Sequence, residues 1–230
     1  MTQATALILA AGRGERLGGD LPKPLLLLRG KPILAYALEA FERCPSIDRV
    51  VLVVPPGDEE RFRESVVLAI GAKKVDRIVA GGDHRQRSLA AGLAHVGEAW
   101  VAVHDGVRPF VDPLCISRCV EAAAWSGAAI LAVPVRETIK LVSPDRRVIS
   151  SPDRSRLWTA QTPQCFRTSL LVEALHQATE ESFLGTDEAS LLERLGAPVE
   201  IVPGSVENIK ITTPTDLILA EAIAASLETG

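Results

Sequence analysis

The chain has 230 residues, of which 47% are hydrophobic, and a formal net charge of −4. This length and apolar content allow one sizeable α/β core, and the lack of a basic excess argues against a nucleic-acid partner. No apolar run approaches the ~20 residues of a membrane span, and Met1–Thr5 lacks the positive start of a signal peptide, so we expect a cytoplasmic protein. The four cysteines form no C-x-x-C pair, which favours reduced thiols and no cysteine metal site.

The first predicted strand runs into a loop rich in glycine and cations. Ala6 to Ala11 form an uncharged apolar run, which is typical of a buried parallel strand. Four glycines, two arginines and Lys23 lie between Gly12 and Pro24. Glycines let backbone N–H groups approach an anion closely, and the cations supply the opposing charge. The stretch therefore predicts a nucleotide phosphate site at the carboxyl end of the first strand.

Two better-known phosphate loops are excluded. The dinucleotide fingerprint G-x-G-x-x-G fails because Leu17 occupies the place of its third glycine, and no acid ends the second predicted strand. The Walker pattern fails because Gly19 is followed by Asp20 and Leu21. The alternative is a surface loop whose cations are only solvated, but prolines on both sides of Lys23 favour a fixed site.

Helices and strands alternate in the next part of the chain. Pro32 suits the first position of a helix whose apolar face includes Ile33, Leu38 and Phe41. After it, the apolar patterns predict a buried strand over 50–54, an amphipathic helix over 58–70 and a short strand over 77–80.

A second glycine loop, Gly81–Ser88, precedes a helix that continues to about Val96. Backbone N–H groups in front of a helix N-terminus favour anions or nucleobase edges. The alternative is that Ser88 simply caps the helix, and both interpretations can hold together.

An acid follows the next predicted strand, 100–103. Asp105 lies at the carboxyl end of a central strand, where a hydrated Mg²⁺ is usually held beside phosphates, so we predict it to be the metal ligand. The alternative is a turn aspartate paired with Arg108. His104 is interpreted as a packed or hydrogen-bonded residue and not as a ligand.

A hairpin interrupts the α/β pattern after residue 135. Asp112 and Pro113 predict the start of a helix, Gly127 its end, and a buried strand follows over 128–135. Alternating residues and a turn signal then predict a β-hairpin within 136–157. A two-stranded ribbon is marginal alone, so it is either an arm for a second subunit or an ordinary surface hairpin. We predict one domain over 1–230 with 136–157 inserted as this β-arm.

The rest of the chain returns to the α/β pattern. Thr168 is expected to cap one helix and the loop 185–188 to cap another, with acids in its first turn. A last core strand is predicted over 198–202, and Thr213 and Pro214 open the final helix.

Seven motifs occur in a fixed order along the chain. They are A-A-G-x-G-x-R-x-G with P-K, G-G-x-x-R-x-x-S, H-D-x-x-R-P, T-x-K, L-W-x-A-x-T-P-Q, T-D-E-A-S and N-I-K-I-T. Together they resemble the 2-C-methyl-D-erythritol 4-phosphate cytidylyltransferases of the non-mevalonate isoprenoid pathway. The first motif marks only the wider nucleotidyltransferase superfamily, and the later ones narrow the resemblance, which runs from Ala6 to about Glu221.

The resemblance implies a three-layer α/β nucleotidyltransferase (Rossmann-like) fold with a mixed, mostly parallel sheet, and a homodimer joined by the arm. It implies transfer of CMP from CTP to methylerythritol phosphate with Mg²⁺, releasing pyrophosphate. The implied catalytic residues are Arg16, Lys23, Arg154 and Lys210. The nucleotide would be bound by Ala10, Ala11, Gly12, Gly14, Gly82, Asp83 and Ser88, and the acceptor by Thr138, Arg154, Thr162, Glu207 and Lys210. Asp105 would hold the metal, and Thr138 would come from the neighbouring subunit.

Three positions depart from the family pattern: Pro24 follows P-K, Gly106-Val107 replaces two alanines, and Glu207 takes a place often held by Asp. Two rival functions stay open at this point. One is a cytidylyltransferase for another polyol phosphate, such as ribitol 5-phosphate, which would share the nucleotide loops. The other is a non-catalytic nucleotide-binding regulator, which we would expect to lack Lys23 or Asp105.

Overall fold

The computed structural model describes residues 2–12 and 21–229. A central sheet of seven strands has the spatial order β11–β7–β10–β6–β1–β4–β5. Its strands are β1 (Ala4–Leu9), β4 (Ile47–Val54), β5 (Val75–Ala80), β6 (Trp100–Asp105), β7 (Ala128–Pro134), β10 (Trp158–Arg167) and β11 (Glu200–Pro203). β10 is antiparallel to both β6 and β7, whereas the other paired strands are parallel. The predicted mixed, mostly parallel α/β sheet is confirmed.

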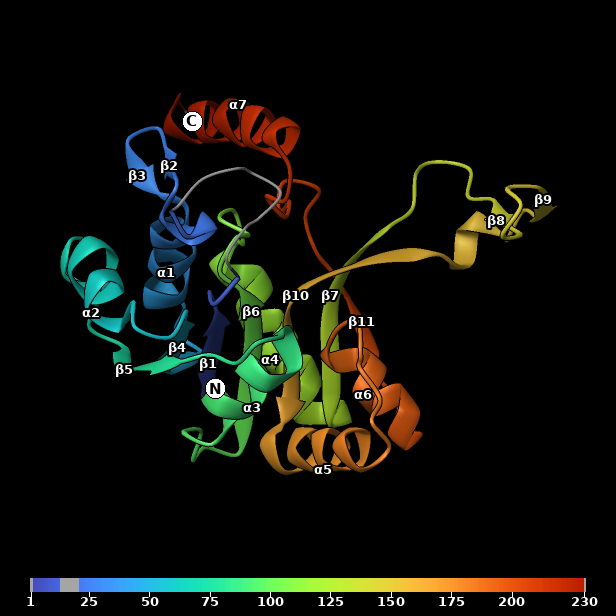
Figure 1. Cartoon of the computed structure of the whole chain (residues 1–230), viewed down its shortest axis with the longest axis horizontal. Helices are drawn as coiled ribbons and strands as arrows, with labels where there is room; N and C mark the ends of the chain where they lie inside the picture. The colour runs from blue at the N-terminus through green and yellow to red at the C-terminus, as the bar shows by residue number, and fades with distance from the viewer. Residues whose placement is uncertain (1, 13–20, 230) are drawn as a thin grey trace.

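Helices cover both faces of this sheet (Figure 1). They are α1 (Ile33–Arg43), α2 (Glu59–Phe62) with its π-helical continuation η3 (Arg63–Leu68), α3 (Arg85–Leu93), α4 (Pro113–Ser126), α5 (Thr168–Glu180) and α6 (Glu188–Leu195). Alternate residues of β1 face opposite sides: Ala6 and Ile8 pack in one core with α1 and α4, and Leu7 packs in the other with α3, α5 and α6. The result is the predicted three-layer arrangement.

A third, smaller core lies beyond the carboxyl ends of the strands. The hairpin of β2 (Leu27–Leu28) and β3 (Lys31–Pro32) packs with α1 and the last helix, α7 (Pro214–Thr229), which Figure 1 shows above the sheet. Among the described residues no helix is both long and apolar enough to cross a membrane.

The start of α7 is held by a reciprocal cap. Asp216 Oδ2 accepts hydrogen bonds from the backbone N–H of Thr212 (2.8 Å) and of Thr213 (2.7 Å), and Thr213 Oγ1 accepts from Asp216 N (3.3 Å). The Thr212 hydroxyl also donates to Asp216 Oδ2 (2.7 Å). These hydrogen bonds favour the carboxylate form and lower the pKa of Asp216 to about 2.

The cap of α7 predicts a pH-dependent stability. Because the folded pKa of Asp216 is depressed, its contribution is present above the ordinary carboxyl pKa of about 4 and is lost as pH falls through about 2. We expect Asp216→Asn to lower the free energy of unfolding at pH 7 by about 1 kcal/mol and by less at pH 3. Denaturant unfolding at both pH values measures this, with Asp48→Asn at an exposed position as the control. A deficit of equal size at both pH values would contradict it.

Two predicted caps are wrong. Ser88 does not cap α3, because His84 occupies the N-cap with extended backbone and its Nδ1 accepts from Arg87 N (3.4 Å). Thr168 is the first residue of α5 and not its cap, because its hydroxyl donates to the carbonyl of Glu98 (2.7 Å). The predicted cap Asp112 and the predicted helix end Gly127 are confirmed, and Pro32 lies one residue earlier than expected, at the N-cap of α1. The loop 185–188 caps α6 as predicted, but of its two acids only Glu188 lies in the first turn, because Asp187 is the N-cap.

The inserted segment contains a short hairpin. β8 (Leu141–Val142) pairs antiparallel with β9 (Val148–Ser150), and a short 3-10 helix, η4 (Arg154–Arg156), leads back to β10. Figure 1 shows this part of the chain projecting from the body beyond β7 and β10. The hairpin lies within the predicted 136–157, and the remaining residues form the two connections to the sheet.

Candidate active site

A cavity of about 840 Å³ opens at the carboxyl ends of parallel strands. The residues that follow β1, β4, β5 and β6 all contribute to its wall, as expected for an α/β ligand site. It is lined by Leu9, Ala10, Ala11, Gly12, Lys23, Pro24, Pro56, Gly81, Gly82, Asp83, His84, Arg85, Ser88, Asp105, Val107, Lys210 and Thr212. Nine of the predicted site residues are therefore brought to one cavity from five separate stretches of sequence.

The two glycine loops touch each other in this wall. The backbone N–H of Gly82 donates to Ser88 Oγ (3.1 Å), and the first loop is held by Ala10 N donating to the Val53 carbonyl (2.7 Å). A Cβ on Gly81 would lie only 2.6 Å from Ala11 Cβ, so this position requires glycine. Gly14 and Arg16, the other predicted residues of the first loop, lie outside the described residues.

Lys23 places a buried cation at the edge of the cavity. It begins the short 3-10 helix η2 (Lys23–Leu25), between Pro22 and Pro24, and its Nζ donates to the carbonyl of Thr212 (3.4 Å). Because Lys23 lines the cavity, it adds a positive charge to the wall that an anionic ligand would face.

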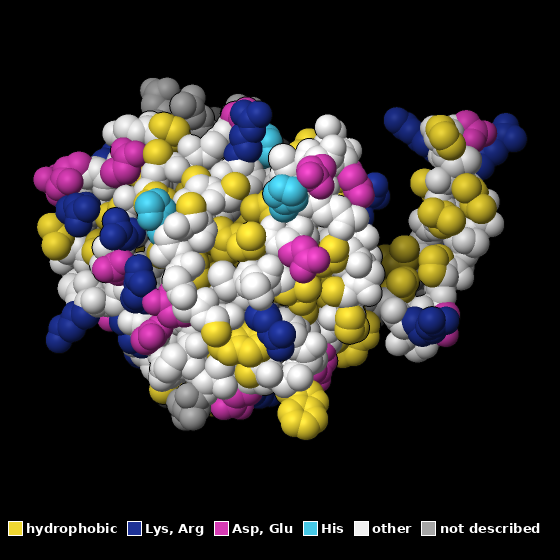
Figure 2. Space-filling model, turned by 90° about the horizontal axis from the view of Figure 1, so that it is seen from below, with side chains coloured by type: hydrophobic (Ala, Val, Ile, Leu, Met, Phe, Trp, Pro, Cys, Tyr) yellow, Lys and Arg dark blue, Asp and Glu magenta, His cyan; other side chains and the backbone are white. Residues whose placement is uncertain are grey.

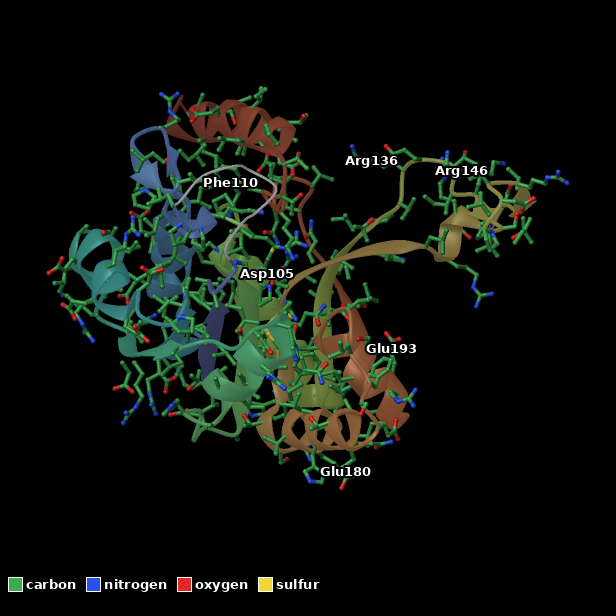
Figure 3. The ribbon with its side chains drawn as sticks, in the orientation of Figure 1. Asp105, Phe110, Arg136, Arg146, Glu180 and Glu193 are labelled. Atoms are coloured by element: carbon green, nitrogen blue, oxygen red, sulfur yellow. The ribbon has the colours of Figure 1, made fainter. Side chains whose placement is uncertain are left out.

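Asp105 lies at the centre of a cluster of cations. Its Oδ1 accepts from Arg85 Nη2 (3.1 Å), and its Oδ2 lies 2.8 Å from Lys210 Nζ and 3.7 Å from Arg108 Nε. Burial alone would raise the pKa of Asp105, but the charges of Arg85 and Lys210 outweigh it and hold the pKa well below its usual range. Figure 3 shows Asp105 inside the molecule, at the end of β6. The alternative predicted from sequence, a pair with Arg108, thus exists alongside two closer partners.

A smaller cavity of about 210 Å³ lies on the other side of this cluster. Arg85, Asp105 and Lys210 line both cavities and so form a shared wall. The small cavity is also lined by Arg108, Ala160, Gln161, Thr162, Gln164, Thr186 and Asp187. Two ligand-sized spaces therefore meet at one carboxylate and two cations.

Thr162 lies in the small cavity through an irregularity of β10. The register of β10 on β7 shifts between Ala160 and Gln164, and Thr162 Oγ1 accepts from the backbone N–H of Asp105 (3.1 Å). The same hydroxyl bonds to Nδ1 of His104 (2.9 Å), whose Nε2 lies 3.1 Å from the Arg108 carbonyl. Burial lowers the pKa of His104 to about 4, so it is neutral at pH 7. Nε2 then donates to the carbonyl and Thr162 donates to Nδ1.

Asn208 connects the two strands of chain that carry Thr162 and Lys210. Its side-chain Nδ2 donates to the Thr162 backbone carbonyl (2.9 Å), and the backbone carbonyl of Asn208 accepts from Arg108 Nη1 (2.9 Å). Asn208 is buried, whereas its neighbour Glu207 is exposed and lines neither cavity. The fixed residue of this motif is therefore the asparagine.

Thr138 and Arg154 are not brought to the cavities within one chain. Both are exposed on the projecting segment, where Arg154 Nη1 donates to the Arg136 carbonyl (2.6 Å). Figure 3 shows Arg136 and Arg146 on that segment, away from Asp105.

No catalytic or binding role was assigned to Arg85 or Glu188 from the sequence. Arg85 stands in the second glycine loop, so a cation among glycines was the available signal. Glu188 was interpreted as an acid that complements a helix dipole, yet its side chain is fully buried against Arg85. No pattern along the sequence indicates a pair that lies 103 residues apart.

Mg²⁺ chemistry is compatible with the large cavity. Among residues 2–12 and 21–229 no three His, Cys, Asp or Glu side chains form a cage for a metal ion. Mg²⁺ is usually bound by one or two carboxylates together with substrate phosphates and water, so a single aspartate in a nucleotide-sized cavity fits it. Asp105 is the carboxylate that lines both cavities, which makes it the ligand most suited to an ion carried by a polyphosphate.

The comparisons with known proteins agree on one family. The family model described as 2-C-methyl-D-erythritol 4-phosphate cytidylyltransferase matches residues 4–226. Relatives of that name include those of Syntrophus aciditrophicus, 46% identical over 96% of this chain and 95% of the relative, and Geobacillus kaustophilus, 47% identical over 96% of each.

Solved structures lead to the same conclusion. The 2-C-methyl-D-erythritol 4-phosphate cytidylyltransferase of Thermus thermophilus superimposes with a TM-score of 0.78 at 33% identity, covering 98% of this chain and 100% of that one. The 4-diphosphocytidyl-2C-methyl-D-erythritol synthase of Anaerococcus prevotii gives a TM-score of 0.86 at 28% identity, covering 97% and 96%. The chain belongs to the 2-C-methyl-D-erythritol 4-phosphate cytidylyltransferase family.

Proposed function

We propose that this protein transfers CMP from CTP to 2-C-methyl-D-erythritol 4-phosphate, giving 4-CDP-2-C-methyl-D-erythritol and pyrophosphate. The observation that carries the proposal is the pair of cavities that share Arg85, Asp105 and Lys210, in a chain of this family. The large cavity suits the nucleotide and the small one the acceptor phosphate. The two reactants would then meet at the shared wall.

The reaction needs charge neutralisation more than proton transfer. An oxygen of the acceptor phosphate attacks the α-phosphorus of CTP, a new P–O bond forms, and the bond to the bridging oxygen breaks to release pyrophosphate. The attacking phosphate monoester is already ionised near neutral pH, so no general base is required. Positioning and opposing charge supply the catalysis. In this proposal Lys23 and Arg16 neutralise the nucleotide phosphates, and Lys210 aims the acceptor phosphate.

The remaining wall residues bind the two ends of the nucleotide. Ala10, Ala11, Gly12 and Gly14 would run along the phosphates, and Gly82, Asp83 and Ser88 would contact the base and ribose. The support is the contact between the two glycine loops, which leaves their backbone groups along one wall. When bound, Mg²⁺ at Asp105 would neutralise phosphate charge as the leaving group departs.

The acceptor site is completed by a second copy of the chain in this proposal. The segment 136–157 carries six Lys or Arg against three Asp or Glu, although the whole chain is acidic. Figure 2 shows it standing apart from the body, with cationic and hydrophobic side chains gathered on it. Its exposed apolar residues include Leu141, Val142, Val148 and Ile149, which is typical of an interface. A homodimer would bring Thr138 and Arg154 of the partner subunit to the small cavity, with Thr162 and Glu207 contacting the same acceptor.

Arg154 tests the acceptor assignment. We expect Arg154→Ala to raise the KM for the acceptor by about 10- to 100-fold, since one charge-assisted contact is worth about 1.5–3 kcal/mol, and to leave CTP binding unchanged. Initial rates at varied acceptor concentration measure it. Arg147→Ala, which removes an exposed arginine paired with Asp145 on the same segment, is the matched control. An unaltered acceptor KM would exclude Arg154 from the site.

Mixing two impaired variants, assayed at an acceptor concentration far below the KM of Arg154→Ala, tests whether the arm acts across subunits. Lys23→Ala damages the body and Arg154→Ala damages the arm, so a mixed dimer would have one intact site. After subunit exchange at equal amounts, about a quarter of the wild-type sites should be intact by random pairing of a twofold dimer. Activity no higher than the sum of the separate variants would show that both residues act within one chain.

Turnover with a panel of polyol phosphates tests the function itself. Pyrophosphate release with CTP and Mg²⁺ should be fastest with 2-C-methyl-D-erythritol 4-phosphate. A preference for ribitol 5-phosphate would establish the rival transferase, and no release with any acceptor would establish the regulator.

A further inference from the structure

Glu188 is a buried carboxylate outside both cavities. It is the first residue of α6, its side chain has no exposed surface, and it lines neither the large nor the small cavity. A buried carboxylate is costly unless a partner compensates it, and an apolar residue at such a place is often equally stable. Stability alone therefore does not account for a charged residue at this position.

The position of Glu188 is fixed by the N-terminus of α6. Asp187 and Ser190 form a capping box there, in which Asp187 Oδ1 accepts from Ser190 N (3.0 Å). Gln164 of β10 ties this turn to the sheet, because its Nε2 donates to Asp187 Oδ2 (2.8 Å) and its Oε1 accepts from Ala189 N (2.9 Å). The carboxylate of Glu188 is thus presented from a rigid base.

Glu188 and Asp105 share one arginine. Both oxygens of Glu188 accept from Arg85, from Nη1 at 2.5 Å and from Nη2 at 2.9 Å. The same guanidinium donates to Oδ1 of Asp105 through Nη2 (3.1 Å) and Nε (3.3 Å). Lys210 then meets the other oxygen, Oδ2, at 2.8 Å. A bidentate pair defines the plane of a guanidinium, so Glu188 sets where Arg85 meets Asp105.

We propose that Glu188 is a positioning residue: by its two hydrogen bonds to Arg85 it keeps the guanidinium on Oδ1 of Asp105 and leaves Oδ2 to Lys210. This inference rests on the proposed cytidylyl transfer and deepens it. Without Glu188, Arg85 keeps Asp105 as its carboxylate partner and moves onto it, in competition with Lys210. The shared wall of the two cavities would then be displaced at the point where the reactants meet.

The test is Glu188→Gln, which keeps the shape of the side chain and removes its charge. We expect kcat at saturating substrates to fall by about 10- to 100-fold, the range for a catalytic group displaced by a fraction of an ångström to 1 Å. CTP affinity, measured by calorimetry without acceptor, should fall by a smaller factor than kcat. A general loss of structure would instead lower both together.

Glu98→Gln is the matched control. Glu98 also pairs with an arginine, Arg49 Nη1 at 2.8 Å, but it lies beside the start of β6, at the opposite end of the strand from Asp105. It should retain wild-type kcat. If Glu188→Gln fails to fold, Glu188→Asp replaces it in the same measurements. This variant keeps the charge but withdraws it from Arg85.

Three results would overturn the inference: a folded Glu188 variant with wild-type kcat, an equal loss of CTP affinity and kcat, or an equal loss of kcat in Glu98→Gln. If the wild-type protein releases pyrophosphate with the acceptor, the first of these removes only the role of Glu188. If the wild-type protein itself is inactive, the proposed function fails and this inference fails with it.

Discussion

Replacing Lys23 by alanine is expected to lower kcat by ~100-fold or more, the cost of losing one preorganised donor to a transition state. Lys23 is buried in the wall of the large cavity, where the ammonium is held at the Thr212 carbonyl. Exclusion of water strengthens the attraction between this ammonium and an anionic ligand, and no solvent cation can replace it at the same geometry. Steady-state rates with CTP and the acceptor, at saturating concentrations of both, measure the loss.

Two further variants separate the charge of Lys23 from its packing. Lys23→Met keeps the buried aliphatic stem and removes only the ammonium. It should therefore lower kcat as much as Lys23→Ala does, but lower the free energy of unfolding by less. Lys31→Ala is the control, because Lys31 is partly exposed, pairs with Glu39 (2.8 Å) and lies outside both cavities. Near-normal turnover in folded Lys23→Met would remove Lys23 from the mechanism.

Asp105→Asn is expected to have the second large effect, on both rate and stability. The substitution keeps the shape but leaves Arg85, Arg108 and Lys210 without their common carboxylate. Breaking a buried ion pair in this way costs about 3–5 kcal/mol of unfolding free energy, with the low end expected because Glu188 still accepts from Arg85. We expect kcat to fall by about 100- to 1000-fold, because the proposed metal ligand and the anchor of Lys210 are lost together.

The sign of the pH effect follows from the depressed pKa of Asp105. A carboxylate whose folded pKa lies below its unfolded value stabilises the protein above the ordinary carboxyl pKa, and this stability is lost as pH falls below it. The stability difference between wild type and Asp105→Asn should therefore be constant from pH 6 to 8 and shrink below about pH 4. Asp76→Asn, which breaks an exposed pair with Arg49, should change the unfolding free energy by less than about 1 kcal/mol and leave kcat unchanged. Wild-type turnover in Asp105→Asn would refute the role of this residue.

The parallel part of the fold could be predicted because each core strand is a local signal. Val50–Val54 is an unbroken apolar run, and both of its faces are indeed buried under helices. The place of β10 between β6 and β7 could not be predicted, because an antiparallel insertion depends on pairing with strands far away in the chain. The start of α3 was predicted four residues late, since His84 is an uncommon cap and Ser88 a common one.

The site shows the same division between local and distant signals. The glycine loops and Asp105 could be found because each directly follows a strand, and carboxyl ends of parallel strands converge. The network of Glu188, Arg85 and Asp105 could not be predicted, because the sequence does not distinguish a buried acid from a solvated one in the first turn of a helix. The nature of the base and the acceptor came from the resemblance and not from the residues, since a polyphosphate site alone favours no particular nucleotide.

The projecting segment leaves and rejoins the body at a single point. Val135 N donates to the Leu157 carbonyl (3.0 Å), and Pro134 stands opposite Trp158 in the adjoining strands. A tight turn could therefore join residues 135 and 157 directly, without moving any strand of the sheet. The segment is therefore a replaceable module. Its length and composition can change, in evolution or by engineering, without altering the residues that fold the nucleotide half of the molecule.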